Sequence, residues 1–514
     1  MAEAIIERLL QALENNASPC QEQSLEEWNN DLEKDLLSGG GSQFSTTVDD
    51  SSDHLSILNT AANRLHDSLQ EAVSPSFDKV ANEIQIDVND QNLSFLSEIL
   101  RATGLFMRWY SQCLQSSLES NVANNPTAIL KSERMLLLYC KLLDDENLQS
   151  SGDCPDIPRF ASICIFRATY GNDGVTVSAR KTFVHSIDGC TCLMKMLLRG
   201  DQPVPRLFSI VRNVHHLISA APETIPKMEK ILETLNADEC LVETGNDNDK
   251  KTYGLLDVLA ATLAWALRSD PPFPGDARDR RSDLALEILR SLFAMDVGKP
   301  AMPLPSNDTM TQIGIMLCEI LRLSNAEMRV YQCKLAVVAL LLNAPGEYSG
   351  YLASHGGIKP LLSIMAYQLS VVVVERTANS AEDAAAVVPI LLVLCKLCQS
   401  NAQILQMVKN VVFPPELEDS FQEKVNAEMA KMQSEGQSKA KNMAPLDAPK
   451  GTVRWKLIRL MTWIDSSVKR SACELLWVLC DEDATEFVLR TGFGNAVYFL
   501  GNKGLVSLPA GVNV

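Results

Sequence analysis

Apolar residues recur along most of the chain at the spacing of one helix face. In the C-terminal part, positions 468, 472, 475, 476 and 479 carry Val, Ala, Leu, Leu and Leu, the i, i+4, i+7, i+8 and i+11 pattern of a wide apolar stripe. Similar stripes occur at 255–267, 284–293, 313–323, 334–342 and 387–397. The β-branched run at 371–374 continues directly from the helical pattern of 361–369. The pattern predicts an all-α protein.

Three segments repeat one layout, in which a helix end, a glycine and a new amphipathic helix follow one another. The glycines are Gly189, Gly357 and Gly492, which lie 168 and 135 residues apart, or four times 42 and three times 45. Armadillo and HEAT repeats have periods of roughly 40–47 residues. A glycine suits such a junction because it adopts positive φ without steric cost. The spacing predicts an armadillo/HEAT-like α-solenoid, a superhelix of helical repeats with these glycines at repeat junctions.

Segments of unusual composition interrupt the expected solenoid and suggest its domain boundaries. We expect helical repeats over 1–432, with a flexible acidic insertion near 38–53, where Gly, Ser and Asp concentrate. Residues 433–450 are rich in Ser, Gly, Lys and Pro, which predicts a flexible linker. The helical pattern resumes over 451–506 as C-terminal repeats, followed by a short tail at 507–514.

Charge and cysteine content narrow the class of protein. The 514 residues include 46 Lys and Arg against 64 Asp and Glu, a net charge of −18, which argues against nucleic-acid binding through a general basic surface and against polybasic membrane attachment. Residues 1–150 hold 24 acidic and 9 basic residues, so the remainder is nearly neutral and could carry a local basic groove. Fourteen cysteines without a signal-peptide pattern or a long apolar run predict reduced thiols in a cytoplasmic protein, with the cell cortex as a second location.

Motifs for covalent chemistry are missing from the sequence. The nearest approach to a phosphate-binding loop, Gly492-Phe493-Gly494, lacks the third glycine and a preceding strand. Cys395 and Cys398 lie within an apolar helical pattern and have no second pair at zinc-finger spacing. No Gly-x-Ser-x-Gly nucleophile elbow occurs. We therefore expect no catalytic residue, no metal and no cofactor, and interpret the chain as a binding protein.

A basic stripe is the strongest candidate for a binding surface. Lys456, Arg459 and Trp463 fall at i, i+3 and i+7, apart from the apolar stripe at 457, 460, 461 and 464. Such a face is most often simply solvated. As a functional feature it would form a basic wall, with an aromatic tip, in the concave groove of the solenoid, suited to a helix with acidic and apolar faces. Two inner-helix asparagines add to this candidate set: Asn343, at the usual armadillo position 14 residues before a junction glycine, and Asn213 in a similar local sequence.

The C-terminal part resembles the synembryn family, the resistance-to-inhibitors-of-cholinesterase proteins. The resemblance begins with the stretch from Trp455 to Cys480, which contains Trp463, Asp465 and Glu474. It continues with two short motifs that look like the family's Thr-Gly-Tyr-Gly-Asn-Ala and closing Arg-Gly-Leu: Thr491-Gly492-Phe493-Gly494-Asn495-Ala496 and Lys503-Gly504-Leu505. It is dense over about 452–505 and weaker back to about 388.

The resemblance implies an armadillo/HEAT-like solenoid that chaperones heterotrimeric G-protein α subunits and promotes their GDP/GTP exchange. It implies a monomer that grips the C-terminal helix of a GDP-bound or nucleotide-free α subunit in its concave groove and reaches the membrane surface only through that subunit. The expected contact residues are Arg454, Lys456, Arg459, Trp463, Lys469, Arg470, Asn213 and Asn343. The alternative is another armadillo-type peptide-binding adaptor without exchange activity. An importin-like adaptor is disfavoured because no Trp is followed by Asn four residues later.

Overall fold

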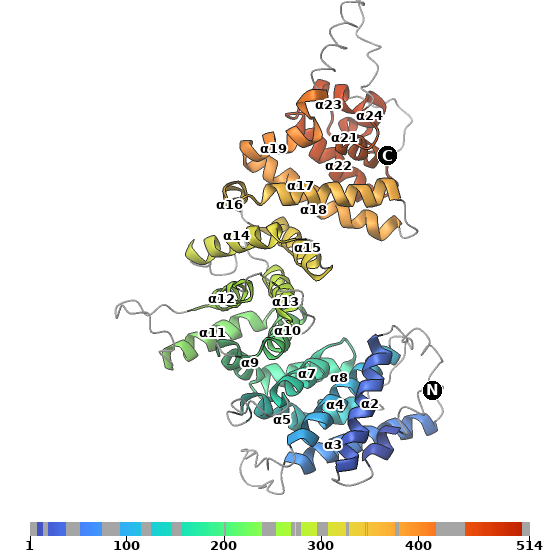
Figure 1. Ribbon diagram of the computed structural model, residues 1–514, viewed down its shortest axis with the longest axis vertical. Coiled ribbons are helices and arrows are strands. Elements are labelled where there is room, and N and C mark those ends of the chain that lie inside the picture. Colours follow the sequence, from blue (N-terminus) through green and yellow to red (C-terminus); the bar gives the residue numbers. More distant parts are fainter. Residues whose placement is uncertain are drawn as a thin grey trace, which may run out of the picture. The chain divides into compact units, whose positions relative to one another are not determined.

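A computed structural model describes most of the chain and contains helices throughout its described part (Figure 1). The described residues are 8–13, 19–37, 52–73, 93–114, 125–145, 148, 156–199, 202–238, 253–268, 273, 279–295, 307–324, 328–344, 346, 348–375, 380–417 and 448–505. No strand occurs among them, so the predicted all-α class is confirmed. The chain divides into two compact units, which are described separately: unit 1 comprises Met1–Thr262 with Asp276–Met295, and unit 2 comprises Leu263–Gly275 with Asp296–Val514.

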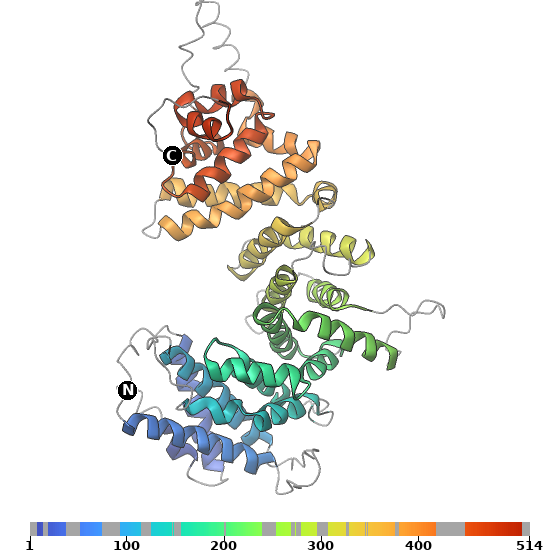
Figure 2. The same cartoon turned by 180° about the vertical axis from the view of Figure 1, so that it is seen from behind.

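Unit 1 is a stack of helices in which successive helical repeats lie side by side. Its described elements are α2 (Pro19–Leu37), α3 (Ser52–Val73), α4 (Leu93–Leu114), the 3₁₀ helix η4 (Pro126–Lys131), α5 (Glu133–Asp144), α7 (Ile157–Thr169), α8 (Gly174–His185), α9 (Gly189–Leu198), α10 (Val204–Ala220), α11 (Thr224–Asp238) and α13 (Arg281–Ala294). Helix α12 (Leu255–Leu267) begins in unit 1 and crosses the boundary at residue 262. Five of these helices form a continuous ladder of neighbours, α2–α4–α7–α10–α13, whose order can be followed by colour from behind (Figure 2).

Unit 2 is built in the same way. Its described elements are α14 (Asn307–Arg322), α15 (Met328–Asn343), α16 (Tyr348–Ser354), α17 (Ile358–Ser370), the π-helical turn η5 (Val371–Glu375), α18 (Ser380–Ser400), α19 (Ala402–Val412), α21 (Val453–Leu460), α22 (Ser466–Leu479), α23 (Ala484–Thr491) and α24 (Phe493–Asn502). Helices α15, α18 and α22 pack in sequence, so the C-terminal repeats share their core with the helices before 418. The β-branched run at 371–374 is helical, as its position after α17 predicts, but it takes the wider π form.

The periodic apolar positions form the core, as the pattern predicts. Within α22, all five residues of the stripe at 468, 472, 475, 476 and 479 are at most 1% exposed. Short polar side chains fix where helices begin: the Asp465 carboxylate accepts hydrogen bonds from the backbone N–H groups of Ser467 and Val468 at the start of α22. The Asp483 carboxylate does the same for Glu486 at the start of α23. These acidic residues therefore have a structural role as helix caps.

The three junction glycines occur where the repeat pattern expects them, but only one for the expected reason. Gly492 joins α23 to α24 with φ +86°, a conformation that favours glycine. At the other two junctions the preceding residue, Asp188 or Gly356, has the positive φ instead. Gly189 is required for space: a Cβ there would lie 2.4 Å from the Phe183 ring. At Gly357 a Cβ would lie 2.6 Å from the Leu352 side chain. The prediction of positive φ is thus wrong at Gly189 and Gly357.

The predicted insertion and linker fall mainly outside the described residues. Of 38–53, only residues 52 and 53 are described, and both belong to the first turn of α3. Of 433–450, only 448–450 are described, and the predicted tail at 507–514 lies beyond the described part. Among the described helices none is by itself long and apolar enough to cross a bilayer, although the bent pair Tyr348–Ser354 and Ile358–Val374 reaches that length and composition jointly.

Candidate functional site

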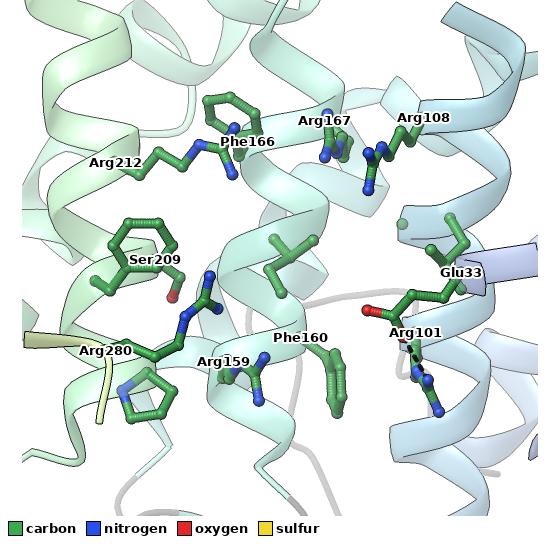
Figure 3. Close-up of a pocket in the computed structure, with 15 residues that line it drawn as sticks. Glu33, Arg101, Arg108, Arg159, Phe160, Phe166, Arg167, Ser209, Arg212 and Arg280 are labelled. Atoms are coloured by element: carbon green, nitrogen blue, oxygen red, sulfur yellow. Dashed lines mark hydrogen bonds and ion pairs between the residues drawn. The ribbon is translucent and has the colours of Figure 1, made fainter. Parts of the chain in front are cut away.

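A pocket of about 350 Å³ opens on the ladder of unit 1, on a face shared by four of its helices (Figure 3). Its lining comes from α2, α4, α7 and α10, together with the residue that precedes α13. Six of the lining side chains are arginines and one is a carboxylate: Arg101, Arg108, Arg159, Arg167, Arg212, Arg280 and Glu33. The pocket is therefore strongly cationic in a chain whose net charge is −18.

Helical spacing explains why these side chains meet. On α4, Arg101, Leu105 and Arg108 lie at i, i+4 and i+7, which places them on one face. On α7, Phe160, Ile163 and Arg167 lie at i, i+3 and i+7. On α10, positions 205, 208 and 212 repeat that spacing. Since α4, α7 and α10 are neighbours in the ladder, their three faces join into one surface.

Apolar side chains line the pocket between the charged groups. Phe166 and Phe208 are 6% and 9% exposed, and Leu105, Phe160 and Ile163 complete this lining. The guanidinium carbon of Arg212 lies 4.3 Å from the centroid of the Phe166 ring, and that of Arg280 lies 4.5 Å from the Phe208 ring. Stacking of this kind orients a guanidinium and leaves its N–H edge available. The pocket can thus take a ligand that is both apolar and anionic.

Two arginines on one side of the pocket, Arg101 and Arg280, are paired with acids. Arg101 donates to a Glu33 carboxylate oxygen at 2.5 Å and to the Asn30 side-chain oxygen at 2.9 Å. Arg280 donates from Nε to the Asp283 carboxylate at 3.1 Å. These contacts neutralise two of the six guanidinium charges of the pocket within the protein itself.

Arg108, Arg167 and Arg212 form the opposite side, which we call the arginine row (Figure 3). None of the three has an ion pair within the part of the chain that the structure describes. Burial, followed by the like charges of Arg212 and Arg108, lowers the pKa of Arg167 to about 9. Burial also lowers the pKa of Arg212, although Glu287 opposes that change. The row thus contains two guanidiniums that are desolvated by burial, Arg167 and Arg212, and none of its three members forms an ion pair among the described residues.

Polar contacts behind the pocket hold α10 against α7. Asn213 is 1% exposed, and its Nδ2 donates to the backbone and side-chain oxygens of Ser162 at 2.9 and 3.0 Å. His216 places Nε2 2.8 Å from the Thr169 carbonyl oxygen at the end of α7, and burial lowers its pKa to about 4. The Asn213 amide is used inside the protein, where it positions the helix that carries Arg212, and its predicted contact with a partner stays a prediction.

Two residues of the predicted C-terminal stripe are also buried. Arg454 is 5% exposed and donates from Nε and Nη2 to the carbonyl oxygen of Arg490, at 3.1 and 2.6 Å. Lys456 is 9% exposed and donates from Nζ to the Ser370 hydroxyl at 2.6 Å. Both charges point into the protein, because α21 is packed on more than one side and its polar face contacts neighbouring helices. Their predicted contact with a partner stays a prediction.

The remaining predicted residues lie at or near the surface of unit 2. Arg459 and Arg470 are exposed, Lys469 and Trp463 are partly exposed, and Asn343 is exposed at the end of α15. Helix α21 ends at Leu460, so Trp463 follows the helix and does not continue the face of Arg459. The same early end leaves Ile464, expected on the apolar stripe, fully exposed. The predicted stripe is thus reduced to separate charges at Arg459, Lys469 and Arg470.

Sequence reasoning missed the arginine row. Its residues are separated by 59 and 45 positions in the chain, and the first lies in the region whose overall charge is most acidic. A usable signal did exist: pairs of arginines seven or eight residues apart, 101 with 108 and 159 with 167, within helical segments. The described residues contain no cluster of side chains that could hold a metal ion, and their cysteines are buried and unpaired.

Comparison with known proteins identifies the C-terminal part. Residues 444–512 match the model of the family described as guanine nucleotide exchange factor synembryn. The chain is 26% identical over 268 residues to the chaperone Ric-8A of Macaca fascicularis, a match that covers 50% of this chain and 45% of that relative. It is 50% identical over 56 residues to the chaperone Ric-8A of Xenopus laevis, covering 11% and 10% of the two chains.

The chain matches about half the length of the curated relatives from Macaca fascicularis and Pongo abelii. Among solved structures, an engineered protein aligns over 92% of this chain and 98% of its own with a TM-score of 0.37 and 12% identity. The similarity to the synembryn family rests on the family model and on the curated relatives. These matches show that the C-terminal part of the chain is similar to that family, and that about half of the chain is similar to the chaperone Ric-8A proteins.

Proposed function

We propose that this chain binds the α subunits of heterotrimeric G proteins, chaperones them and promotes their GDP/GTP exchange. The family match supports the class of partner: the relatives' printed names describe a chaperone, and the description of the matching family is a guanine nucleotide exchange factor. The observation that carries the proposal is the pocket of unit 1, in which six guanidiniums and an apolar lining share one face of the helical ladder. In this proposal the pocket receives the C-terminal helix of the α subunit.

The chemistry of the pocket suits the end of an amphipathic helix. A helix inserted there would place its apolar side chains against Phe160, Phe166 and Phe208. Its acidic side chains and terminal carboxylate would accept hydrogen bonds from the arginine row, whose members have no ion pair of their own among the described residues. Binding would then relieve part of the repulsion among Arg108, Arg167 and Arg212. The exposed Arg459 and Arg470 of unit 2 remain proposed as further contacts.

Exchange by this route needs no catalytic residue. If the protein prefers an α subunit whose C-terminal helix has been drawn away from the nucleotide site, binding lowers the affinity of that subunit for GDP. By linkage, bound nucleotide weakens the protein's hold on the α subunit to the same degree. The same contacts would stabilise an α subunit that has not completed folding. We therefore expect GTP with Mg²⁺ to release the complex.

The test measures how tightly two charge-reversal variants of this protein bind to an immobilised α subunit. Arg167→Glu with Arg212→Glu alters the pocket, whereas Arg459→Glu with Arg470→Glu alters the exposed surface of unit 2. The matched control, Lys181→Glu with Lys230→Glu, removes the same number of exposed positive charges elsewhere in unit 1. We expect the affinity of the pocket variant for the α subunit to fall by more than about tenfold. An α subunit that lacks its last residues should lose affinity for the parent protein in the same way.

Unchanged binding by a folded pocket variant would refute the pocket as the site. Failure of the intact protein to retain any α subunit, across several α classes, would refute the proposed function itself. The second measurement is release of labelled GDP. Binding without faster GDP release would favour the alternative, an armadillo-type adaptor that holds a peptide and has no exchange activity.

A further inference from the structure

The arginine row differs from Arg101 and Arg280 because none of its guanidiniums contacts a carboxylate in the part of the chain that the structure describes. Arg101 and Arg280 each contact a carboxylate within about 3 Å. Arg108, Arg167 and Arg212 come from three different helices and converge on one side of the cavity, with no ion pair among the described residues (Figure 3). Glu287 favours the charged form of Arg212 from nearby, but among the described residues no carboxylate forms an ion pair with any of the three guanidiniums. Three guanidiniums held together in this way can accept an anion from outside.

The row is held in place by packing. The Phe166 ring contacts two of its members, with the guanidinium carbons of Arg212 and Arg167 at 4.3 and 5.3 Å from the ring centroid. Phe166 is itself 6% exposed and stacks on Tyr170 with their centroids 4.8 Å apart. Because the ring is fixed, the two guanidiniums are oriented before any ligand arrives. Pre-organised donors lose less conformational entropy on binding than flexible surface lysines would.

The charge of the row indicates the charge of its ligand. One carboxylate would neutralise one of three guanidiniums, whereas a phosphate dianion would neutralise two and offers several oxygens to planar N–H forks. The cavity of about 350 Å³ exceeds the volume of a phosphate group alone. Its apolar lining, including Phe160 and Phe208, could hold the organic part of a phosphate ester.

We propose that the arginine row binds small polyvalent phosphate anions, namely phosphomonoesters and pyrophosphates. A second consequence rests on the proposed function: such an anion occupies the position of the acidic end of the partner helix and competes with it. Free phosphate compounds would then regulate how much of the protein is available to an α subunit, without acting on the nucleotide site of that subunit.

The direct test measures pyrophosphate binding to the full-length protein by titration calorimetry, with no α subunit present. Ionic strength is held constant with sodium chloride. We expect one molecule of pyrophosphate per chain, and at least about tenfold weaker binding in Arg167→Gln with Arg212→Gln. The matched control, Lys181→Gln with Lys230→Gln, removes two exposed charges from the same unit and should bind as the parent does. Thermal melting of each variant verifies that it is folded.

Equal binding by the parent and the folded pocket variant would overturn the proposal. An equal loss in the control, or binding of several pyrophosphates per chain, would overturn it too, because both indicate general attraction to positive charge. The competition is measured separately with a peptide that carries the last helix of an α subunit. If pyrophosphate binds and no α subunit does, the anion site stands and the proposed function fails. If the α subunit binds and pyrophosphate does not, the anion site fails alone.

Discussion

Replacing Arg167 with Gln should make the protein more stable while weakening its binding site. Burial of the guanidinium, followed by the like charges of Arg212 and Arg108, lowers its pKa from the usual value for an arginine to about 9. A difference of about three pKa units corresponds to ~4 kcal/mol of cost for keeping the charge at neutral pH. This is an upper bound, because water reaches part of the side chain and screens the repulsion.

The substitution also removes favourable contacts. The guanidinium carbon lies 5.3 Å from the centre of the Phe166 ring, a contact that contributes about 0.5–1 kcal/mol, and part of the side-chain packing is lost with it. The expected net gain in free energy of unfolding is therefore about 1–2 kcal/mol at pH 7. The assay is urea unfolding of the parent and of Arg167→Gln, followed by circular dichroism.

The pH dependence of the stability difference between the parent and Arg167→Gln shows whether the buried charge is its cause. Below the lowered pKa, Arg167 is charged in both folded and unfolded states, so the full cost is present. As the pH rises through about 9, the folded state releases the proton while the unfolded state retains it, and the parent gains stability relative to the variant. The advantage of Arg167→Gln should thus shrink above pH 9. A variant less stable than the parent at pH 7, with a difference that does not change with pH, would refute the reasoning.

Two further predictions concern the packing of helices. Gly189→Ala should lower the free energy of unfolding by about 1–3 kcal/mol, because the new methyl group overlaps the Phe183 ring. Gly350→Ala is the control and should not lower it, because a Cβ at that position meets nothing within 4 Å. Melting temperatures check this pair, and equal effects would contradict it. Acidification from pH 7 towards pH 4 should destabilise the parent more than the variant His216→Asn. In the folded protein the pKa of His216 is about 4, so the imidazole stays neutral over this range, whereas the same residue in the unfolded chain takes up a proton near pH 6.5. Protonation therefore stabilises the unfolded state of the parent alone. Parallel losses of stability in the two proteins across that range would show that His216 does not contribute.

Much of the fold could be predicted because helical periodicity is a local property. The stripe in α22 identified its buried residues correctly, since burial of one face requires only the 3.6-residue period. The end of α21 could not be predicted in the same way. The apolar pattern continues to Ile464, but the helix ends at Leu460 and the next begins after its cap, Asp465. The cap determined the boundary, and the apolar pattern alone did not reveal it.

The site was less predictable because it depends on which helices are neighbours. Arg108, Arg167 and Arg212 belong to one surface only after α4, α7 and α10 have packed together. Conversely, Arg454 and Lys456 look exposed in a helical projection, yet their long side chains reach carbonyl and hydroxyl groups of other helices. A helix in a stack has two or three contacting faces, so a polar stripe does not establish contact with solvent.

The contacts of α10 with α7 have a consequence for cooperativity. His216 closes the last turn of α7 through the Thr169 carbonyl, and Asn213 occupies the Ser162 oxygens in the middle of that helix. Helix α18 does the same for α15 in unit 2, where Lys396 donates to the Leu342 carbonyl at 3.0 Å. In each case a later helix completes the hydrogen bonding of an earlier one. Neighbouring repeats joined in this way should unfold together, because loss of the later helix removes these hydrogen bonds and exposes the apolar face that the earlier helix buries against it.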